Sequence, residues 1–205
     1  MADTARDHFI NWLRDAYAME RQACDMIENT LPRVTEFQTL HSRLQQHLTE
    51  SQQQADRVER ALHELGADTS AIKTGIAKLM GNLGTMANMV NSDEPVKAVI
   101  AHYSWEHFEI GNYRSHISTA RSMGFAEIAR MFEESLREEE AMQAFLAEQI
   151  PLVTAQFLQS EGGTVAGASG TDAVTHAQGA TTEDASISNI GSMPDGTRVV
   201  RDTSI

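Results

Sequence analysis

The sequence predicts an all-α protein: an antiparallel four-helix bundle over residues 1–160, with a crossover that contains a short helix, followed by a disordered low-complexity tail over residues 161–205. Apolar residues recur at alternating steps of three and four in four long segments, which is the spacing of one helix face. Gly or Pro stands near the ends of these segments. After Ser160, Gly, Ala, Ser and Thr dominate and no aromatic residue occurs, so this part cannot bury enough apolar surface to offset its chain entropy.

The first two predicted helices run from about residue 5 to 31 and from about residue 36 to 65, with Pro32 between them. Glu20 interrupts the otherwise uncharged inward face of the first helix, and Glu50 lies on the inward face of the second, one turn from Gln54. The remaining inward positions are Ile10, Leu13, Tyr17, Cys24, Ile27 and Leu31 in the first helix, and Leu40, Leu44, His47, Gln54, Val58 and Leu62 in the second.

The third predicted helix begins at Pro95 and ends before Gly124, and the fourth runs from about residue 125 to 157, with Pro151 expected near a boundary. The third turns inward Val96, Val99, Tyr103, Glu106, Ile110, Tyr113, Ile117 and Ala120, and the fourth Ile128, Phe132, Ser135, Glu139, Met142 and Leu146. Residues 71–91 contain three glycines, each of which weakens a helix by about 1 kcal/mol relative to alanine. This segment is therefore the crossover.

The composition excludes several classes of function. A formal charge of −13 repels nucleic acid and anionic membrane surfaces and favours cations, although surplus acid is also typical of a well-solvated surface. Cys24 is the only cysteine, so the chain can build neither an internal disulfide nor a cysteine-based zinc site. No window of 18 apolar residues occurs and the N-terminus lacks the pattern of a signal peptide, so we expect a cytoplasmic protein without membrane contact.

The four inward glutamates are predicted to reach one level of the bundle. Residues equally distant from the turn of a helical hairpin lie at the same height, because each residue rises about 1.5 Å in both helices. The midpoint of Glu20 and Glu50 falls at residue 35, beside the first turn, and that of Glu106 and Glu139 falls between residues 122 and 123, beside the last turn. Each hairpin therefore delivers a pair of carboxylates at mid-length.

Burying four carboxylates requires compensation, because two like charges about 4 Å apart repel by roughly 4 kcal/mol at an effective dielectric constant near 20. Metal ions, shared protons or arginine pairing can supply it, and Arg43 is the only arginine expected to point inward. Carboxylate oxygens at the centre of a bundle suit iron or manganese, and two ions sharing bridging carboxylates are the expected occupancy. The predicted metal ligands are Glu20, Glu50, Glu106 and Glu139, with Glu109 and His47 as further candidates.

Both further candidates have an alternative interpretation. Glu109 lies one turn from Glu106 and could equally face solvent or a subunit partner. His47 could be a hydrogen-bonded core residue rather than a ligand. Tyr17 and Tyr103, each one turn from an inward glutamate, could hydrogen-bond the carboxylates or serve only as core aromatics.

These residues resemble the YciE/YciF group of ferritin-like stress proteins over roughly residues 6–155. The resemblance rests on Asp15-Ala-Tyr-Ala-Met-Glu20-Arg-Gln22, His47-Leu-Thr-Glu50 with Gln54, Glu106-His107-Phe108-Glu109-Ile110 with Tyr113, and Leu136-Arg-Glu138-Glu139. It implies a ferritin-like bundle of the rubrerythrin type, usually a homodimer, associated with bacterial stress responses and without a firmly assigned reaction.

The sequence departs from the ferritin-like pattern at two positions. Ferritin-like di-iron sites commonly carry Glu-x-x-His in the second and fourth helices, whereas Gln53 and Met142 stand at the histidine positions here. Two functions stay open as a result. One is a dinuclear iron or manganese protein that reacts with peroxide or oxygen, and the other is a protective or structural bundle with a degenerate metal site.

Overall fold

The computed structural model describes residues 4–68 and 95–162, which fold into four α-helices and one short 3₁₀ helix. Helix α1 spans Ala5–Thr30, the 3₁₀ helix η1 spans Leu31–Arg33, and α2 spans Gln38–Glu64. Helix α5 spans Pro95–Ser122 and α6 spans Ala126–Ser160. The all-α four-helix bundle is thereby confirmed, while the predicted crossover helix and tail lie outside the described residues.

Local sequence signals explain where these helices begin and end. Thr4 caps α1 by accepting from the backbone N–H of Asp7, whose carboxylate in turn accepts from the backbone N–H of Thr4. Pro32 occurs at the start of η1, where a missing N–H costs nothing. Gly66 and Gly124 have φ values of 61° and 81° after α2 and α5, a left-handed conformation that suits glycine and stops the helix.

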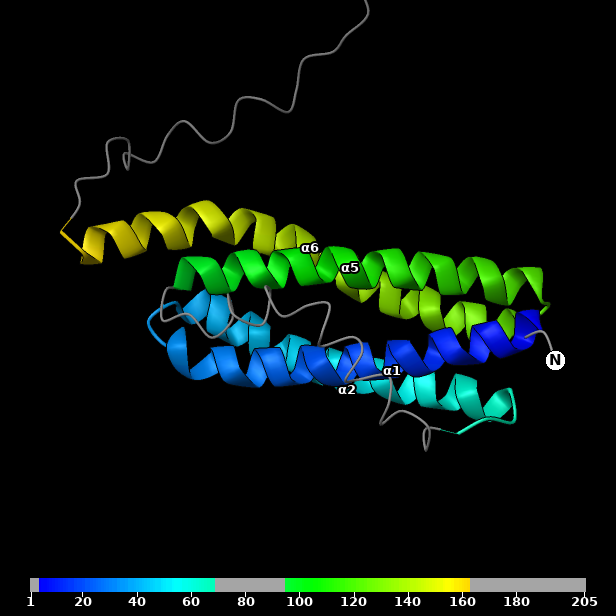
Figure 1. Cartoon of the computed structure of the whole chain (residues 1–205). Coiled ribbons are helices and arrows are strands. Elements are labelled where there is room, and N and C mark those ends of the chain that lie inside the picture. Colours follow the sequence, from blue (N-terminus) through cyan, green and yellow to red (C-terminus); the bar gives the residue numbers. More distant parts are fainter. Residues whose placement is uncertain (1–3, 69–94, 163–205) are drawn as a thin grey trace, which may run out of the picture. The chain divides into compact units, whose positions relative to one another are not determined.

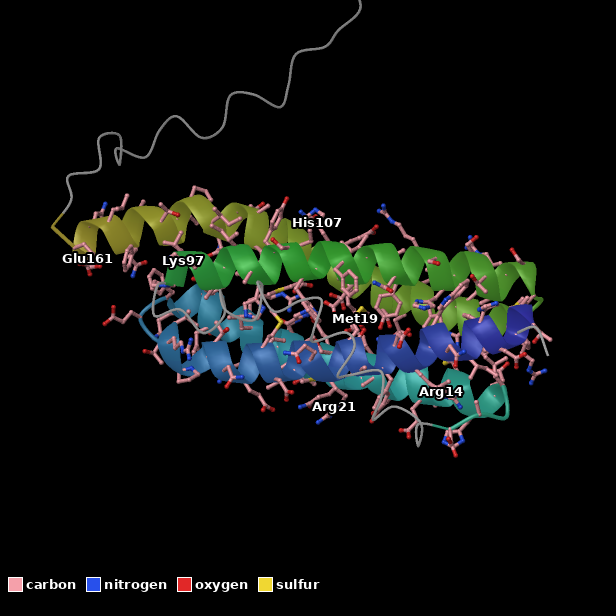
Figure 2. All side chains as sticks on the ribbon, viewed as in Figure 1. Arg14, Met19, Arg21, Lys97, His107 and Glu161 are labelled. Carbon is pink, nitrogen blue, oxygen red and sulfur yellow. The ribbon has the colours of Figure 1, made fainter. Side chains whose placement is uncertain are left out.

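The helices form two hairpins that pack against each other. Helix α1 packs chiefly on α2, and α5 on α6, while α1 also contacts α5 and α2 contacts α6 (Figure 1). Each helix separates an inner from an outer face, as Figure 2 shows for α1, where Met19 points into the bundle and Arg21 points away from it. The predicted inward faces are confirmed for α2 and α6, since every uncharged position named above for those helices is buried.

A polar layer interrupts the apolar core. One apolar cluster contains Phe9, Leu13, Val58, Leu62, Tyr113, Ile117, Ile128 and Phe132, and a second contains Ile27, Leu40, Leu44, Val99, Met142 and Leu146. In α2 the residues between these clusters include buried His47, Ser51 and Gln54, and in α6 they include buried Ser135 and Glu139. Burial of so many polar groups at one level is costly, so this layer is the part of the core that packing alone does not explain.

Pro151 does not mark a helix boundary. Helix α6 continues through it to Ser160, and Val153 beyond it is 2% exposed in the second apolar cluster. Pro151 itself is exposed, so its ring points away from the core and the packing of the last helical turns compensates for the missing backbone hydrogen bond. Within the described residues, no helix is long and apolar enough to cross a membrane.

Candidate metal centre

Four buried side chains from three helices converge in the polar layer. His47 comes from α2, Glu106 and Glu109 from α5, and Glu139 from α6, and one ligand atom of each lies within 4.8 Å of the others. Glu106 and Glu109 are three residues apart, which places both on one side of α5. Glu109 therefore does not face solvent, and the ring of His47 also points into the core, as it would either as a ligand or as a hydrogen-bonded core residue.

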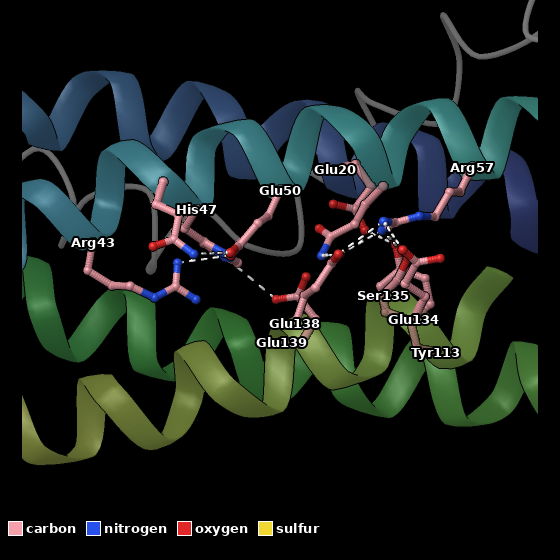
Figure 3. A network of polar contacts seen from close by, with 12 residues as sticks. Glu20, Arg43, His47, Glu50, Arg57, Tyr113, Glu134, Ser135, Glu138 and Glu139 are labelled. Atoms are coloured by element: carbon pink, nitrogen blue, oxygen red, sulfur yellow. Dashed lines mark hydrogen bonds and ion pairs between the residues drawn. The ribbon is translucent and has the colours of Figure 1, made fainter. Parts of the chain in front are cut away.

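His47 is held from its outer side. Its Nδ1 lies 2.9 Å from Oε2 of Glu50, whose carboxylate also accepts hydrogen bonds from Arg43 at 2.9 Å and Gln46 at 2.7 Å (Figure 3). A hydrogen on Nδ1 directed at Glu50 fixes the tautomer and leaves Nε2 directed inward. Nε2 lies 3.2 Å from Oε2 of Glu106 and 3.6 Å from Oε2 of Glu139. Three electron-rich atoms therefore meet, and a proton or a metal ion must lie among them.

The inward atoms of this layer lack hydrogen bonds among the described residues. They are Glu20 Oε2, His47 Nε2, Glu106 Oε2, both carboxylate oxygens of Glu109 and both of Glu139. His47 and Glu106 are close enough to form an ion pair but are not aligned for a hydrogen bond. A buried polar atom without a partner costs about 1–3 kcal/mol, more if charged, so an unexplained concentration of them is typical of a ligand site.

Among residues 4–68 and 95–162, protons are the only positive charges inside the cluster itself. Burial, reinforced by the neighbouring carboxylates, raises the pKa values of Glu109 and Glu139 well above the ordinary glutamate value. Burial alone would lower the pKa of His47, but the charges of Glu106 and the hydrogen bond to Glu50 raise it to about 9. Burial likewise opposes ionisation of Glu106, yet the charge of His47 and the neighbouring carboxyl group of Glu139 leave its pKa below the ordinary value. In the metal-free protein, these protons hold the position of a cation.

Glu20 joins the layer from α1 but lies outside the group of four. It is fully buried, and its Oε1 accepts a hydrogen bond of 2.5 Å from the phenol of Tyr113. Burial raises the pKa of Glu20 to about 8, with the hydrogen bond from Tyr113 and the charge of His47 acting in the opposite direction. Its other oxygen is one of the unpartnered atoms, so the predicted inward orientation of Glu20 is confirmed.

Glu50 has a different setting from the other predicted ligands. Its side chain is 16% exposed, and its ligand atoms do not belong to the group of four. Although burial opposes ionisation, the hydrogen bond to His47 and the charge of Arg43 lower its pKa to about 2. Glu50 is thus an ionised carboxylate at the edge of the layer that holds a histidine, and Glu109 is the fourth buried glutamate.

The prediction that Arg43 is the only inward arginine is wrong, because Arg57 is more deeply buried. Arg57 is 5% exposed and contacts Glu138 at 2.6 and 3.0 Å, Glu134 at 3.1 Å and Ser135 at 3.2 Å. Gln54 donates to Glu138 at 2.9 Å in the same network. The position of Arg57 beside Val58, at the flank of the apolar face, was the available signal, since long arginine side chains often bury their stems there.

Of the two alternatives for Tyr17 and Tyr103, the structure agrees with the one in which they are core aromatics. Tyr17 and Tyr103 are half-buried and pack against the two apolar clusters. The phenol that contacts a buried carboxylate belongs instead to Tyr113, which is fully buried and whose ring lies 5.8 Å from that of Phe132. Tyr113 is seven residues from Glu106, two helical turns along α5, so its inward direction was predictable but its partner on α1 was not.

Comparisons with known proteins place the chain in a family. The model of DUF892, a domain of unknown function, matches residues 4–159. Protein YciF of Escherichia coli K12 is 28% identical over 144 residues, which cover 67% of this chain and 85% of that protein. The chain belongs to the YciE/YciF family. The resemblance inferred from the four sequence blocks is thereby confirmed.

Solved structures of similar chains share the bundle of this YciE/YciF member. A protein of Xanthomonas campestris pv. campestris is 34% identical, with a TM-score of 0.65 and coverage of 77% of this chain and 98% of that one. YcfI of Rhodopseudomonas palustris, described as a putative structural protein, is 26% identical, with a TM-score of 0.55 and coverage of 71% and 94%. The E. coli stress protein YciF has a TM-score of 0.62 over 76% of this chain and 99% of its own, and at 20% identity it supports the fold alone.

Proposed function

We propose that this chain is a ferritin-like stress-response protein that binds a dinuclear iron or manganese centre through buried carboxylates and His47. The observation that carries the proposal is the set of unpartnered inward atoms on Glu20, Glu106, Glu109, Glu139 and His47. An apolar or simply hydrogen-bonded core gains nothing from such an arrangement, whereas bound cations would give these atoms partners.

The donor set fits iron or manganese. Carboxylate oxygens with a single imidazole nitrogen, contributed by facing helices of a bundle, are ligands that these ions accept, and soft thiolate donors are absent from the described layer. Glu106, Glu109, Glu139 and His47 would hold the metal, and Glu20 would add a carboxylate from α1. When bound, iron or manganese would supply the redox capacity for a reaction with peroxide or oxygen.

The chain's own residues would prepare the centre. Burial of the layer excludes bulk water, and Glu50 fixes the ring of His47 so that Nε2 points at the carboxylates. Metal binding would displace the protons held on Glu109, Glu139 and His47, because these atoms can bind a cation only after they lose their hydrogens. We therefore expect binding to release protons and to strengthen as pH rises.

The comparisons support the stress-response part of this proposal at the level of the family. The structure of one relative is described as that of a stress protein, which agrees with a protective role here. A cytoplasmic location and a homodimer, both expected from the sequence, complete the proposal.

Metal content tests the proposal directly. After anaerobic reconstitution with ferrous iron or Mn²⁺, elemental analysis should find about two ions per chain, and peroxide should oxidise the iron-loaded protein. The variant Glu139→Gln should lose most of the metal, because it removes a buried anionic ligand. Glu140→Gln is the matched control. Glu140 follows Glu139 on α6, but its carboxylate is partly exposed and paired with Arg114, so metal content should stay unchanged. A wild-type chain that folds but binds no iron or manganese would disprove the metal centre.

The second candidate function is a protective or structural bundle without redox turnover. It is favoured by the residues at the two ferritin-like histidine positions, since Met142 is a fully buried apolar side chain and Gln53 is exposed. The description of YcfI from Rhodopseudomonas palustris as a putative structural protein agrees with it. Metal that binds but stays unreactive toward peroxide and oxygen would favour this function.

A further inference from the structure

The hydrogen bond between Tyr113 and Glu20 connects a buried phenol to the one ligand of the proposed centre that lies outside the group of four. The donor–acceptor distance is 2.5 Å, and both side chains are fully buried. A buried polar atom without a hydrogen bond destabilises the fold. Tyr113 donates to Oε1 of Glu20 only, and Oε2 has no hydrogen-bond partner among the described residues. The two oxygens of one carboxylate therefore have separate environments.

Tyr113 is itself held in place from the outside of the layer. Its ring packs against Phe132, and the hydroxyl of Ser135 is a polar neighbour of its phenol. Ser135 accepts from Arg57, which is fixed by its contacts with Glu138 at the edge of the bundle (Figure 3). A continuous set of contacts thus runs from the edge of α2 and α6 to Glu20 on α1, and it restricts the rotation of the Glu20 carboxylate.

A similar arrangement occurs at His47 on α2, where one atom of the side chain is hydrogen-bonded and the other is not. Glu50, which is paired with Arg43, accepts a hydrogen bond from Nδ1 of His47, and Nε2 of His47 has no hydrogen bond. Tyr113 likewise hydrogen-bonds one oxygen of Glu20, and the other oxygen has none. The two anchored groups differ in their neighbours. Nε2 of His47 belongs to the compact group with Glu106, Glu109 and Glu139, whereas Glu20 lies outside it. Two cations that shared the central carboxylates would therefore bind at unequal positions, one beside His47 and one beside Glu20.

We propose that Tyr113 is a positioning residue that reserves Oε2 of Glu20 for the weaker of two cation positions, the stronger being the one at His47. This inference rests on the proposed metal centre and adds to it an order of filling. The first ion binds at His47 with Glu106, Glu109 and Glu139, and the second requires the carboxylate that Tyr113 orients. Loss of the phenol leaves the fold intact but lets Glu20 rotate, which weakens the second position alone.

Calorimetric titration of the metal-free full-length chain with Mn²⁺ tests this order. The wild type should bind two ions in two resolved steps. Tyr113→Phe keeps the ring and its packing, and it should retain the first step while weakening the second by about tenfold or more, the usual effect of losing a group that orients a ligand. Glu20→Gln should show the same selective loss, and the double variant should lose no more than either single variant.

Tyr17→Phe is the matched control, because Tyr17 lies one turn from Glu20 on α1 but is half-buried against the apolar cluster. It should leave both steps unchanged. Circular dichroism and thermal unfolding of each metal-free variant check that the bundle is folded, and Ser135→Ala provides a second, milder way to loosen Tyr113.

Each other result overturns the inference in a distinguishable way. Two unchanged steps in both Tyr113→Phe and Ser135→Ala would show that the phenol does not position a ligand. Equal losses in Tyr113→Phe and Tyr17→Phe, or loss of both steps, would show a general effect on the core. A wild type that binds one ion would remove the second position but leave metal binding standing, and one that binds none would also disprove the proposed function.

Discussion

The glutamates of the polar layer differ sharply in how their charges are compensated. Glu106 has an imidazolium nitrogen 3.2 Å from one of its oxygens, and Glu50 has Arg43 and His47. Glu109, in contrast, has two buried oxygens that make no hydrogen bond among the described residues. A residue that costs stability without forming a contact is expected to serve binding, because function and stability place opposite demands on such a position.

Replacing Glu109 by leucine should therefore stabilise the metal-free protein. Leucine has a similar size and needs no partner, so the free energy of unfolding should rise by about 1–3 kcal/mol, the cost of a buried unsatisfied polar group. Urea unfolding in the presence of a chelator measures the change. Metal uptake should fall in the same variant, whereas a destabilised metal-free variant would show that Glu109 makes a stabilising contact.

His116 provides a second test at this scale. Its ring is 2% exposed between Phe9 and Phe132, and burial lowers its pKa from 6.5 to about 4. The folded state thus keeps His116 neutral while the unfolded chain binds a proton below pH 6.5. Its contribution to stability is complete above that pH and decreases as the pH falls toward 4, because the unfolded state binds the extra proton.

Between pH 7.5 and pH 5, the metal-free wild type should lose about 2 kcal/mol of stability through this histidine. His116→Phe keeps an aromatic ring in the cluster but has no group that titrates in this interval. Its loss of unfolding free energy between the two pH values should be smaller than that of the wild type by about 2 kcal/mol, measured by urea unfolding. His63→Gln, at an exposed position on α2, is the control and should follow the wild type. Identical pH dependence in His116→Phe and wild type would contradict the assignment.

At the scale of the element, α6 is the helix whose sequence and structure conflict. Pro151 removes the N–H that the carbonyl of Ala147 would accept, and an interior proline weakens a helix by about 3 kcal/mol. The helix continues nonetheless, because Val153 inserts into the second apolar cluster and couples the last turns to the core. Tertiary packing overrides local propensity here.

Pro151→Ala should consequently stabilise the protein by about 1–3 kcal/mol, since it restores one backbone hydrogen bond and removes the clash with the preceding turn. The greater freedom of alanine in the unfolded chain offsets part of the gain. Chemical denaturation followed by helical circular dichroism measures it. Leu152→Ala, at a side chain that is 60% exposed, should change stability by less than about 0.5 kcal/mol. A destabilised Pro151→Ala would mean that the proline conformation is required.

At the scale of the whole molecule, the polar layer is where the two hairpins meet. Helix α2 contributes His47 and α1 contributes Glu20, while α5 and α6 contribute the other three carboxylates. Neither hairpin alone assembles the group, so a bound ion would connect the two halves. Metal binding and global stability are therefore expected to be linked.

Mn²⁺ at one hundred times its dissociation constant should add about 2.7 kcal/mol per site that exists only in the folded state. For a domain of this size that corresponds to a rise in Tm of roughly 5–10 °C. Differential scanning calorimetry with and without Mn²⁺ measures the shift, and a chelator should reverse it. Glu139→Gln should show a much smaller rise, whereas an equal rise in that variant would place the bound ion outside the polar layer.

The sequence determined the four helices, the inward faces of α2 and α6 and the presence of buried acids. Helical periodicity depends only on the spacing of apolar residues along one chain, and capping and glycine signals act within a few residues. Glu20, Glu106 and Glu139 could be identified from the sequence for the same reason, because each interrupts an otherwise uncharged helix face. Equal distance from a turn also predicted correctly that the hairpins bring acids to one level.

Tertiary structure alone decided which side chains of that level meet. Glu50 and His47 are three residues apart on α2, and a small rotation of the helix determines which of them points inward. Here His47 faces the core and Glu50 holds it from the edge, while Glu109 occupies the interior from α5. The partnership of Tyr113 with Glu20 spans 93 residues, and no local pattern encodes it. Such contacts depend on how the two hairpins dock, which is a property of the assembled core.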